Sequence, residues 1–357
     1  MDKSTLIEKA YGLVRDGLKF EKFGSGHIHS TYLVSAGEKK YILQAFNKHV
    51  FRYPERISAN HQLLSQHFDA KDLPFVLPFP IKNTQGEFFT QDEEGLYRLF
   101  PFVEGVTKDA VEQPQQARLA AEAFAIFNKT FLEVPVNELQ ESIPDFHNLL
   151  LRYQQLQDSF ENTQLILEPE VELLLDFYLD QTDLLSQYQH YQQTLPLRVT
   201  HSDTKINNLI FSHEMTKVNA LIDLDTIMPG YIFYDFGDLA RTVACTEDES
   251  SQNWGRIKLD MDKYAALLKG FCEPLFPYTS KDELYSLPFG GEMMTYIMGL
   301  RFLADYLNGN IYYTIHYPEQ NLHRAKNQRE LLIALRENRD IIDLKMGEIL
   351  ANLVIKP

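Results

Sequence analysis

Three short apolar runs between residues 197 and 238 limit the folds open to this chain. The first run, residues 197–200, leads into a polar loop that carries Asp203. The second and third runs, residues 208–211 and 218–223, flank a polar connector, as the two strands of a β-hairpin do. The pattern therefore predicts a strand, a polar loop and a hairpin in this part of the chain.

The predicted hairpin brings an amide and a carboxylate together. If its turn is centred near Met215, Asn208 faces Asp223, and directly opposed residues have Cβ atoms roughly 4.5–5.5 Å apart. Such a pair of oxygen donors suits magnesium, which binds one or two protein oxygens and completes its shell with water and phosphate. Asp203 lies on the loop just before, close to that ion and able to meet a hydroxyl group. Kinases use this arrangement for phosphoryl transfer: a base, then a metal-binding asparagine, then a metal-binding aspartate.

The motif His201-x-Asp203-x-x-x-x-Asn208, followed by Asp223-x-Asp225, resembles the aminoglycoside phosphotransferase and choline kinase superfamily. Longer segments are similar to the bacterial N-acetylhexosamine 1-kinases: residues 197–208, 221–230 and 299–307, and His27 in a glycine-flanked turn. The motifs occur in the same order, and the similarity extends from near residue 20 to near residue 330.

This resemblance implies an α+β, two-lobed fold of the protein-kinase type. Residues 1–103 would form a nucleotide-binding lobe with a small antiparallel sheet and one bracing helix. Residues 104–357 would form a larger, mostly helical lobe that carries the catalytic and acceptor-binding groups.

Within that fold, the resemblance assigns roles to the central stretch. Asp203 would accept or orient the proton of the acceptor hydroxyl group, and Asn208 and Asp223 would hold magnesium on the phosphates. Asp225 would be either a second metal ligand or a group that orients the first. His201 would hold the loop by hydrogen bonding.

Composition excludes several kinds of partner. The net charge of −16 and the isoelectric point near 5.1 argue against nucleic-acid or anionic-membrane binding, which needs a basic face. Cys245 and Cys272 are too few for a disulfide framework and are expected in the core. The first 20 residues read as a charged amphipathic helix without the apolar centre of a signal peptide, and no run reaches the ~20 apolar residues of a membrane span. A cytoplasmic location is therefore expected, where ATP and magnesium are available.

Residues 22–38 predict a strand, a glycine-containing turn and a second strand. Gly24 and Gly26 would let the backbone approach phosphates, and Ser30 or Thr31 could donate a hydrogen bond to them. Alone, this pattern also fits an ordinary hairpin, but the kinase-like motif later in the chain favours a nucleotide site. His27 at the tip either fills space or, as the resemblance implies, reaches the acceptor.

The strand expected at residues 40–46 departs from the kinase pattern. It carries Gln44 where kinases place a phosphate-binding lysine, and an amide donates hydrogen bonds but brings no charge. The helix expected at residues 54–68 has proline in its first turn and carries Gln62, which is either the partner of Gln44 or a surface residue. Lys205 is expected to supply the missing charge to the transferred phosphate, the alternative being a solvated loop lysine.

A crossover between the lobes is expected within residues 96–105, where a strand runs into proline and glycine. By resemblance, the backbone of Pro101, Phe102 and Val103 would bind adenine there. From residue 113 to about residue 192, apolar residues recur at three- and four-residue spacing, which is typical of helices that form a scaffold.

Two further regions carry charged residues with more than one interpretation. Asp235 and Asp238 are expected to cap a helix at residues 239–243 and to hold the catalytic loop, although Asp-Phe-Gly is also a metal motif. On the helix expected at residues 291–308, spacing alone makes Arg301 and Asp305 an i, i+4 ion pair on a solvated face. The resemblance instead places Arg301, Asp305 and Tyr312 at the sugar.

Together, these features predict an ATP- and magnesium-dependent kinase that phosphorylates the anomeric hydroxyl group of N-acetylglucosamine or N-acetylgalactosamine. A kinase of choline, an aminoglycoside or another small alcohol shares the same catalytic stretch and stays open. A nucleotide-binding pseudokinase is a second alternative, raised by Gln44. A metal-dependent hydrolase built on His201 is disfavoured because no second histidine lies at ligand spacing.

Overall fold

The computed structural model describes residues 2–14, 17–24, 29–47, 51–67, 69 and 73–355. The chain divides into two compact units. The first comprises Met1–Val106, Asn137–Pro144 and Ile210–Met228, and the second comprises Thr107–Val136, Asp145–Leu209 and Pro229–Pro357. The predicted boundary followed residue 103, whereas the first break in the structure follows Val106 and two later segments return to the first unit.

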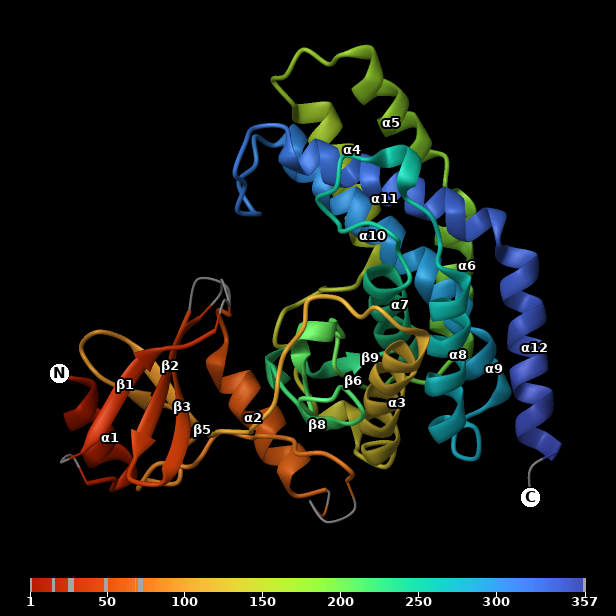
Figure 1. Ribbon diagram of the computed structural model, residues 1–357. Coiled ribbons are helices and arrows are strands. Elements are labelled where there is room, and N and C mark those ends of the chain that lie inside the picture. The colour runs from red at the N-terminus through yellow and green to blue at the C-terminus, as the bar shows by residue number, and fades with distance from the viewer. Residues whose placement is uncertain are drawn as a thin grey trace. The chain divides into compact units, whose positions relative to one another are not determined.

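The first unit is built on a five-stranded antiparallel sheet with the strand order β1-β2-β3-β5-β4 (Figure 1). Its strands are β1 (Leu18–Lys22), β2 (Ser30–Ala36), β3 (Lys39–Phe46), β4 (Thr90–Gln91) and β5 (Leu96–Pro101). Helix α1 (Lys3–Tyr11) packs Leu6 and Ile7 against Val34, Leu43 and Leu99 of the sheet. The strands predicted around the glycine turn and at residues 40–46 are confirmed.

Helix α1 is shorter than the predicted N-terminal helix. Gly12 adopts a left-handed backbone with φ 67°, and its N–H group donates to the carbonyl of Glu8. Because glycine takes this conformation without steric cost, the helix stops there and Leu18 begins a strand instead. Helix α2 (Pro54–Ser65) carries proline in its first turn, as predicted.

The predicted hairpin consists of β7 (Leu209–Phe211) and β8 (Val218–Leu221). The N–H group of Ser212 donates to the carbonyl of Lys217 at 2.9 Å and closes the turn. Asn208 ends a 3-10 turn, η3 (Ile206–Asn208), and Asp223 follows β8 in a left-handed conformation. The prediction that these two residues form a cross-strand pair is therefore wrong, because neither lies in a strand.

The second unit is mainly helical, with one pair of short strands, β6 (Arg198–Thr200) and β9 (Met228–Gly230). Its helices are α3 (Pro114–Thr130), α4 (Leu149–Asn162), α5 (Pro169–Leu179), α6 (Thr182–Thr194), α7 (Ile232–Val243), α8 (Met261–Leu275), α9 (Lys281–Tyr285), α10 (Leu287–Leu307), α11 (Gln320–Glu337) and α12 (Arg339–Ile355). Helix α3 packs along α8, and α7 packs along α10.

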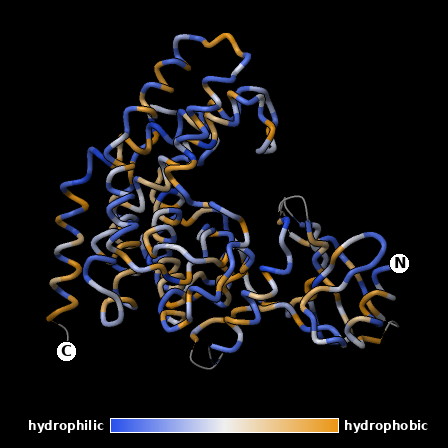
Figure 2. Tube along the Cα trace, turned by 180° about the vertical axis from the view of Figure 1, so that it is seen from behind, coloured by the Kyte–Doolittle hydropathy of each residue, from blue (hydrophilic) through white to orange (hydrophobic). Residues whose placement is uncertain are grey.

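Helix α12 buries a narrow stripe of apolar residues, Ile342, Met346 and Leu350, spaced four residues apart. Other apolar residues of α12 stay exposed, and Figure 2 shows hydrophobic stretches along this helix. In the described part of the chain, every helix is too short or too polar to cross a bilayer. Cys272 is buried as expected, whereas Cys245 is only partly buried.

Candidate active site

The loop that follows β6 is held by one buried carboxylate, Asp235 of α7. Its two oxygen atoms accept hydrogen bonds from the backbone N–H groups of His201 (2.9 Å) and Ser202 (2.8 Å) and from Nδ2 of Asn128 (2.8 Å). The hydroxyl group of Thr204 donates to the backbone carbonyl of Asp235 at 2.6 Å. Burial raises the pKa of Asp235, while its three donors oppose that effect. Asp235 thus fixes the loop, as predicted.

The capping role predicted for Asp235 and Asp238 is wrong. Helix α7 begins at Ile232, so both aspartates lie inside it. Asp238 pairs with Arg241 of the same helix at 2.9 Å. Ile232, Phe233 and Phe236 already have the three- and four-residue spacing of a helix, so the predicted start at residue 239 came too late.

The backbone next to Asp203 is fixed from two sides. The N–H group of Ser202 is bonded to Asp235, and its carbonyl accepts a hydrogen bond from Nε2 of His147 at 3.0 Å. Ser202 has a φ of 65°, a left-handed conformation that residues other than glycine rarely adopt. Strain of this kind persists only where neighbouring contacts hold the backbone, and it is common at functional sites.

Asp203 lies between a cation and an amide. Its Oδ1 atom is 2.9 Å from Nζ of Lys205, and its Oδ2 atom accepts a hydrogen bond from Nδ2 of Asn208 at 2.9 Å. Burial disfavours the ionised form, but the charge of Lys205 and these hydrogen bonds outweigh it, so the pKa of Asp203 lies below its usual value. The Asp203 carboxylate raises the pKa of Lys205 in turn. Asp203 is therefore ionised at neutral pH, as a proton acceptor must be.

The magnesium site remains a prediction. The described residues contain no cluster of three or more His, Cys, Asp or Glu side chains suited to a metal ion. Asn208 donates hydrogen bonds from Nδ2 to Asp203. This leaves the amide oxygen of Asn208, Oδ1, as its acceptor atom. Asp223 follows β8 with φ 60° and ψ 56°. An amide oxygen with a carboxylate is a donor set that fits magnesium.

Arg301 of α10 lines a hollow of about 510 Å³ in the second unit. Its guanidinium carbon lies 5.2 Å from the ring of Phe146, 5.6 Å from that of Tyr312 and 5.5 Å from that of Tyr313. Its Nη2 atom is 3.4 Å from the hydroxyl oxygen of Tyr312. Within the described ranges, no carboxylate forms an ion pair with Arg301, and its guanidinium group lines this hollow.

Asp305 supports the wall of the same hollow. It accepts hydrogen bonds from the backbone N–H groups of Tyr312 (2.8 Å) and Tyr313 (3.0 Å) and from Nδ2 of Asn321 (2.9 Å). The solvated ion pair that spacing suggested for Arg301 and Asp305 is therefore wrong, because the buried carboxylate of Asp305 binds the loop after α10 instead.

A chain of contacts links Arg301 and its hollow to the backbone next to Asp203. Arg301 lies over Phe146, whose ring centroid is 4.4 Å from that of His147. His147 donates to the carbonyl of Ser202, the residue before Asp203. In the sequence, residues 145–148 read as an N-cap cluster, and Asn148 does cap α4, but that pattern does not predict the contact of His147 with the loop of Asp203.

In the first unit, three predicted nucleotide residues lie near the first strands: Gly24 just after β1, Ser30 in β2 and Gln44 in β3. Gly24 has a φ of 76°, which favours glycine, and Ser30 begins β2. Gly26 and His27 lie outside the described residues. Gln62 accepts from Nζ of Lys82 at 2.6 Å, so the suggested pairing of Gln62 with Gln44 is wrong.

The predicted adenine segment follows the end of β5 at Pro101. The N–H group of Phe102 donates to the carbonyl of Lys40 at 3.4 Å, and its ring lies 5.9 Å from that of Phe23. Val103 is half-buried. Adenine binding by this segment stays a prediction.

Gln44 and Asp225 share a partner that the sequence analysis missed, Arg98 of β5. Gln44 lies opposite Arg98 in the antiparallel register, and both it and Asp225 accept hydrogen bonds from the arginine. The available signal was an arginine within an otherwise apolar strand.

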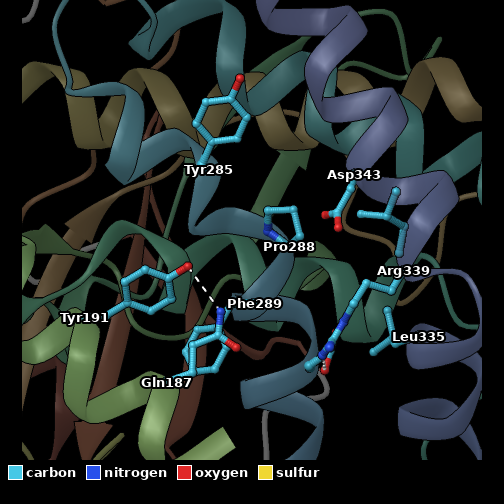
Figure 3. Close-up of a pocket in the computed structure, with 10 residues that line it drawn as sticks. Gln187, Tyr191, Tyr285, Pro288, Phe289, Leu335, Arg339 and Asp343 are labelled. Atoms are coloured by element: carbon cyan, nitrogen blue, oxygen red, sulfur yellow. Dashed lines mark hydrogen bonds and ion pairs between the residues drawn. The ribbon is translucent and has the colours of Figure 1, made fainter. Parts of the chain in front are cut away.

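A second hollow in the helical unit is smaller, about 130 Å³ (Figure 3). The side chains of Gln187 and Tyr191 are joined by a hydrogen bond of 3.3 Å at its wall. Arg339 there is paired with Glu292. This hollow therefore lacks an unpaired cation of the kind that Arg301 presents.

Comparison with known proteins shows which solved structures and which family this chain resembles. Among solved structures, the chain is similar to a microcompartment-associated aminopropanol kinase, with 15% identity and a TM-score of 0.65 over 96% of this chain and 98% of that one. It is also similar to choline kinase from Cryptosporidium parvum Iowa II, with 14% identity and a TM-score of 0.61 over 97% of this chain and 98% of that one. A spectinomycin phosphotransferase in complex with ADP and spectinomycin has 12% identity and a TM-score of 0.55, over 93% of this chain and 97% of that one.

These similarities show the fold, which is the α+β, protein-kinase-like fold that the sequence predicts. The sequence pattern of the phosphotransferase enzyme family (APH) matches residues 19–267, a range that includes Asp203, Asn208 and Asp223. Because this match covers well over half of the chain, the protein belongs to the phosphotransferase enzyme family.

Proposed function

We propose that this phosphotransferase is an ATP- and magnesium-dependent kinase of the anomeric hydroxyl group of N-acetylglucosamine or N-acetylgalactosamine. One observation carries the proposal. Arg301 presents its charge to a pocket whose wall leads through Phe146 and His147 to the loop of Asp203. The motif similarity to N-acetylhexosamine 1-kinases supports the same assignment.

The charge of Arg301 discriminates between acceptor classes. Aminopropanol, choline and ethanolamine kinases, to which this chain is structurally similar, are named for acceptors that carry an amine or quaternary ammonium group. A cationic acceptor would be repelled by an arginine that has no carboxylate partner in the described ranges. A sugar offers ring, hydroxyl and acetamide oxygens to the five N–H donors of a guanidinium group.

Asp203 would accept the hydrogen bond of the sugar hydroxyl. As the sugar oxygen bonds to the γ-phosphorus of ATP, its proton passes to Asp203 and the bond between that phosphorus and the bridging oxygen breaks, releasing ADP. Lys205, 2.9 Å from Asp203, would stabilise negative charge on the transferred group. Such a site works by positioning and charge neutralisation, without a covalent protein intermediate.

The oxygen atoms of Asn208 and Asp223 would hold magnesium. When bound, the ion would neutralise charge on the nucleotide phosphates. The adenine would bind the backbone after β5, and Gly24 and Ser30 would face the phosphates.

An acceptor panel in a coupled ADP-release assay tests this function. We expect turnover with N-acetylglucosamine or N-acetylgalactosamine and none with their methyl glycosides, in which the anomeric hydroxyl group is blocked. Arg301→Met should raise the KM for the sugar at least tenfold and leave the KM for ATP within about twofold, because Arg301 would contact only the acceptor.

Asp203→Asn controls for contaminating kinases and should lose nearly all turnover while still binding ATP. Faster turnover of choline, ethanolamine or an aminoglycoside than of any sugar would overturn the acceptor assignment. Turnover of the methyl glycosides would show that another hydroxyl group is phosphorylated. ATP binding without turnover on any acceptor would instead support a pseudokinase.

A further inference from the structure

A buried cluster in the first unit carries one arginine and one aspartate. The side chain of Arg98, in the middle of β5, is 2% exposed, as is that of Asp225. The Nη1 and Nη2 atoms of Arg98 donate to the two carboxylate oxygens of Asp225, both at 2.5 Å. Its Nε and Nη2 atoms donate to Oε1 of Gln44 at 2.8 and 2.6 Å. A planar guanidinium group forms this two-pronged pairing with a carboxylate, and lysine cannot.

His29 completes the shell of Asp225. Its Nδ1 atom accepts a hydrogen bond from the N–H group of Asn47 at 2.9 Å, so the proton of the neutral ring lies on Nε2. That Nε2–H group is 3.3 Å from Oδ2 of Asp225 and donates to it. The His29 ring stacks on Phe46 and Phe51, at 4.9 and 5.6 Å between centroids. Asp225 is therefore enclosed by two donor side chains.

Among its described residues, the cluster pairs one arginine with one carboxylate. The guanidinium carbon of Arg98 lies 5.0, 5.6 and 4.9 Å from the rings of Phe46, Phe89 and Phe100. In such an apolar setting a charge is tolerated when it is paired, and among the described residues of this cluster Asp225 supplies the one negative charge. A lysine at position 44, directly opposite Arg98, would add a second buried cation. This explains why the strand carries glutamine.

The segment around Asp225 also fixes Asp223. Asp223 is left-handed, and the 3-10 turn η4 (Leu224–Thr226) follows it directly. The carbonyl of Leu224 accepts a hydrogen bond from Nε2 of His61 at 3.1 Å, and that of Ile227 accepts from Nδ2 of Asn60 at 2.9 Å. The backbone after Asp223 is thus bonded to α2, while the Asp225 side chain is bonded to β5.

We propose that Arg98 is a positioning residue that anchors Asp225, so that Asp225 shapes the metal-binding segment and Asp223 alone ligates magnesium from it. This rests on the proposed phosphoryl transfer and decides between the two roles that the sequence left open for Asp225. Arg98 makes four hydrogen bonds inside the cluster and is buried, so it acts through Asp225 and not by contact with the nucleotide.

Calorimetric titration of ATP with and without Mg²⁺ tests this role. It measures the gain in ATP affinity that Mg²⁺ brings, and a loss of stability alone does not change that gain. In the parent protein, Mg²⁺ should increase ATP affinity, and Asp223→Ala should abolish that increase. Asp225→Asn and Arg98→Met should each reduce it about tenfold and leave metal-free ATP affinity within twofold. The double variant should be no worse than either single variant, because both substitutions break the same anchor.

Arg98→Met leaves a buried carboxylate unpaired and can fail to fold, but the double variant removes both charges and keeps the test available. Arg118→Met removes a different arginine–carboxylate pair, with Glu273, and should leave the Mg²⁺ effect unchanged. If the effects of Arg98→Met and Asp225→Asn add, or if Asp225→Asn abolishes the Mg²⁺ effect as Asp223→Ala does, Asp225 is itself a ligand and the inference fails. If the parent protein shows no Mg²⁺-dependent ATP binding, the proposed function fails instead.

Discussion

The backbone next to Asp203 depends on a neutral histidine. His147 donates from Nε2 to the carbonyl of Ser202, and its Nδ1 atom has no hydrogen-bond partner among the described residues. Burial lowers the pKa of His147 to about 4, because a proton on Nδ1 would place an unpaired charge in the interior.

This histidine makes stability depend on pH. In the unfolded chain a histidine binds a proton below pH ~6.5, whereas the folded His147 stays neutral down to about pH 4. Lowering the pH across this interval therefore favours the unfolded state, by roughly 2 kcal/mol for His147 between pH 7 and 4.5. His147→Gln, which keeps an N–H donor, should show a correspondingly smaller loss of unfolding free energy in urea titrations at the two pH values. Equal losses in both proteins would show that His147 is protonated in the fold.

At the scale of single residues, the sequence predicted contacts between residues that lie close together in the chain. It did not predict contacts between residues that lie far apart in the chain. Asp203, Lys205 and Asn208 lie within six residues and meet as one group. Arg98 and Asp225 are 127 residues apart, and only the strand register and the turn after β8 bring them together. A buried arginine in an apolar strand indicates a buried anion, but it does not identify which one.

At the scale of elements, two glycines set how closely α7 and α10 cross. A Cβ atom added to Gly237 would lie 2.1 Å from the carbonyl oxygen of Gly290, and one added to Gly290 would lie 2.1 Å from the carbonyl oxygen of Phe233. The two backbones therefore touch. Helix α7 carries Asp235, so this crossing also sets where the loop of Asp203 is held.

The same substitution should have opposite effects in two helices. Gly237→Ala forces α7 and α10 apart. It should lower the unfolding free energy by about 3 kcal/mol, which is the upper end of the range typical of overpacked cores. Gly347→Ala on α12, where an added Cβ meets nothing within 4 Å, should raise it by about 0.5–1 kcal/mol because alanine favours helix. Urea unfolding curves of the two variants and the parent protein measure both effects. A stable Gly237→Ala variant with full activity would contradict the close crossing.

Element boundaries were predictable where a local residue sets them. Proline at the start of α2 and the polar connector between β7 and β8 were recognised correctly. The end of α1 at Gly12 was overlooked, although a left-handed glycine cap explains it. The predicted start of α7 was too late, although Ile232, Phe233, Phe236 and Leu239 recur at helical spacing from its first residue.

At the scale of the whole molecule, charge is the property that the sequence determines most directly. The chain carries a net charge of −16, and mutual repulsion of that size opposes a compact state. The Debye length shortens from about 30 Å at 0.01 M salt to about 8 Å at 0.15 M, so repulsion between distant surface carboxylates is largely screened over this range. The buried pair of Arg98 and Asp225 is screened far less.

Raising sodium chloride from 10 to 150 mM at pH 7 should therefore raise the thermal unfolding midpoints. Exposed ion pairs such as that of Lys40 and Glu104 weaken with salt, but pairs of this kind contribute at most about 1 kcal/mol each. Scanning calorimetry at the two salt concentrations measures the shift, and repeating it near the isoelectric point of 5.1 is the control. There the net charge is close to zero, so the shift should shrink. A fall of the midpoints with salt at pH 7 would mean that attraction between opposite charges outweighs the net repulsion in the folded chain.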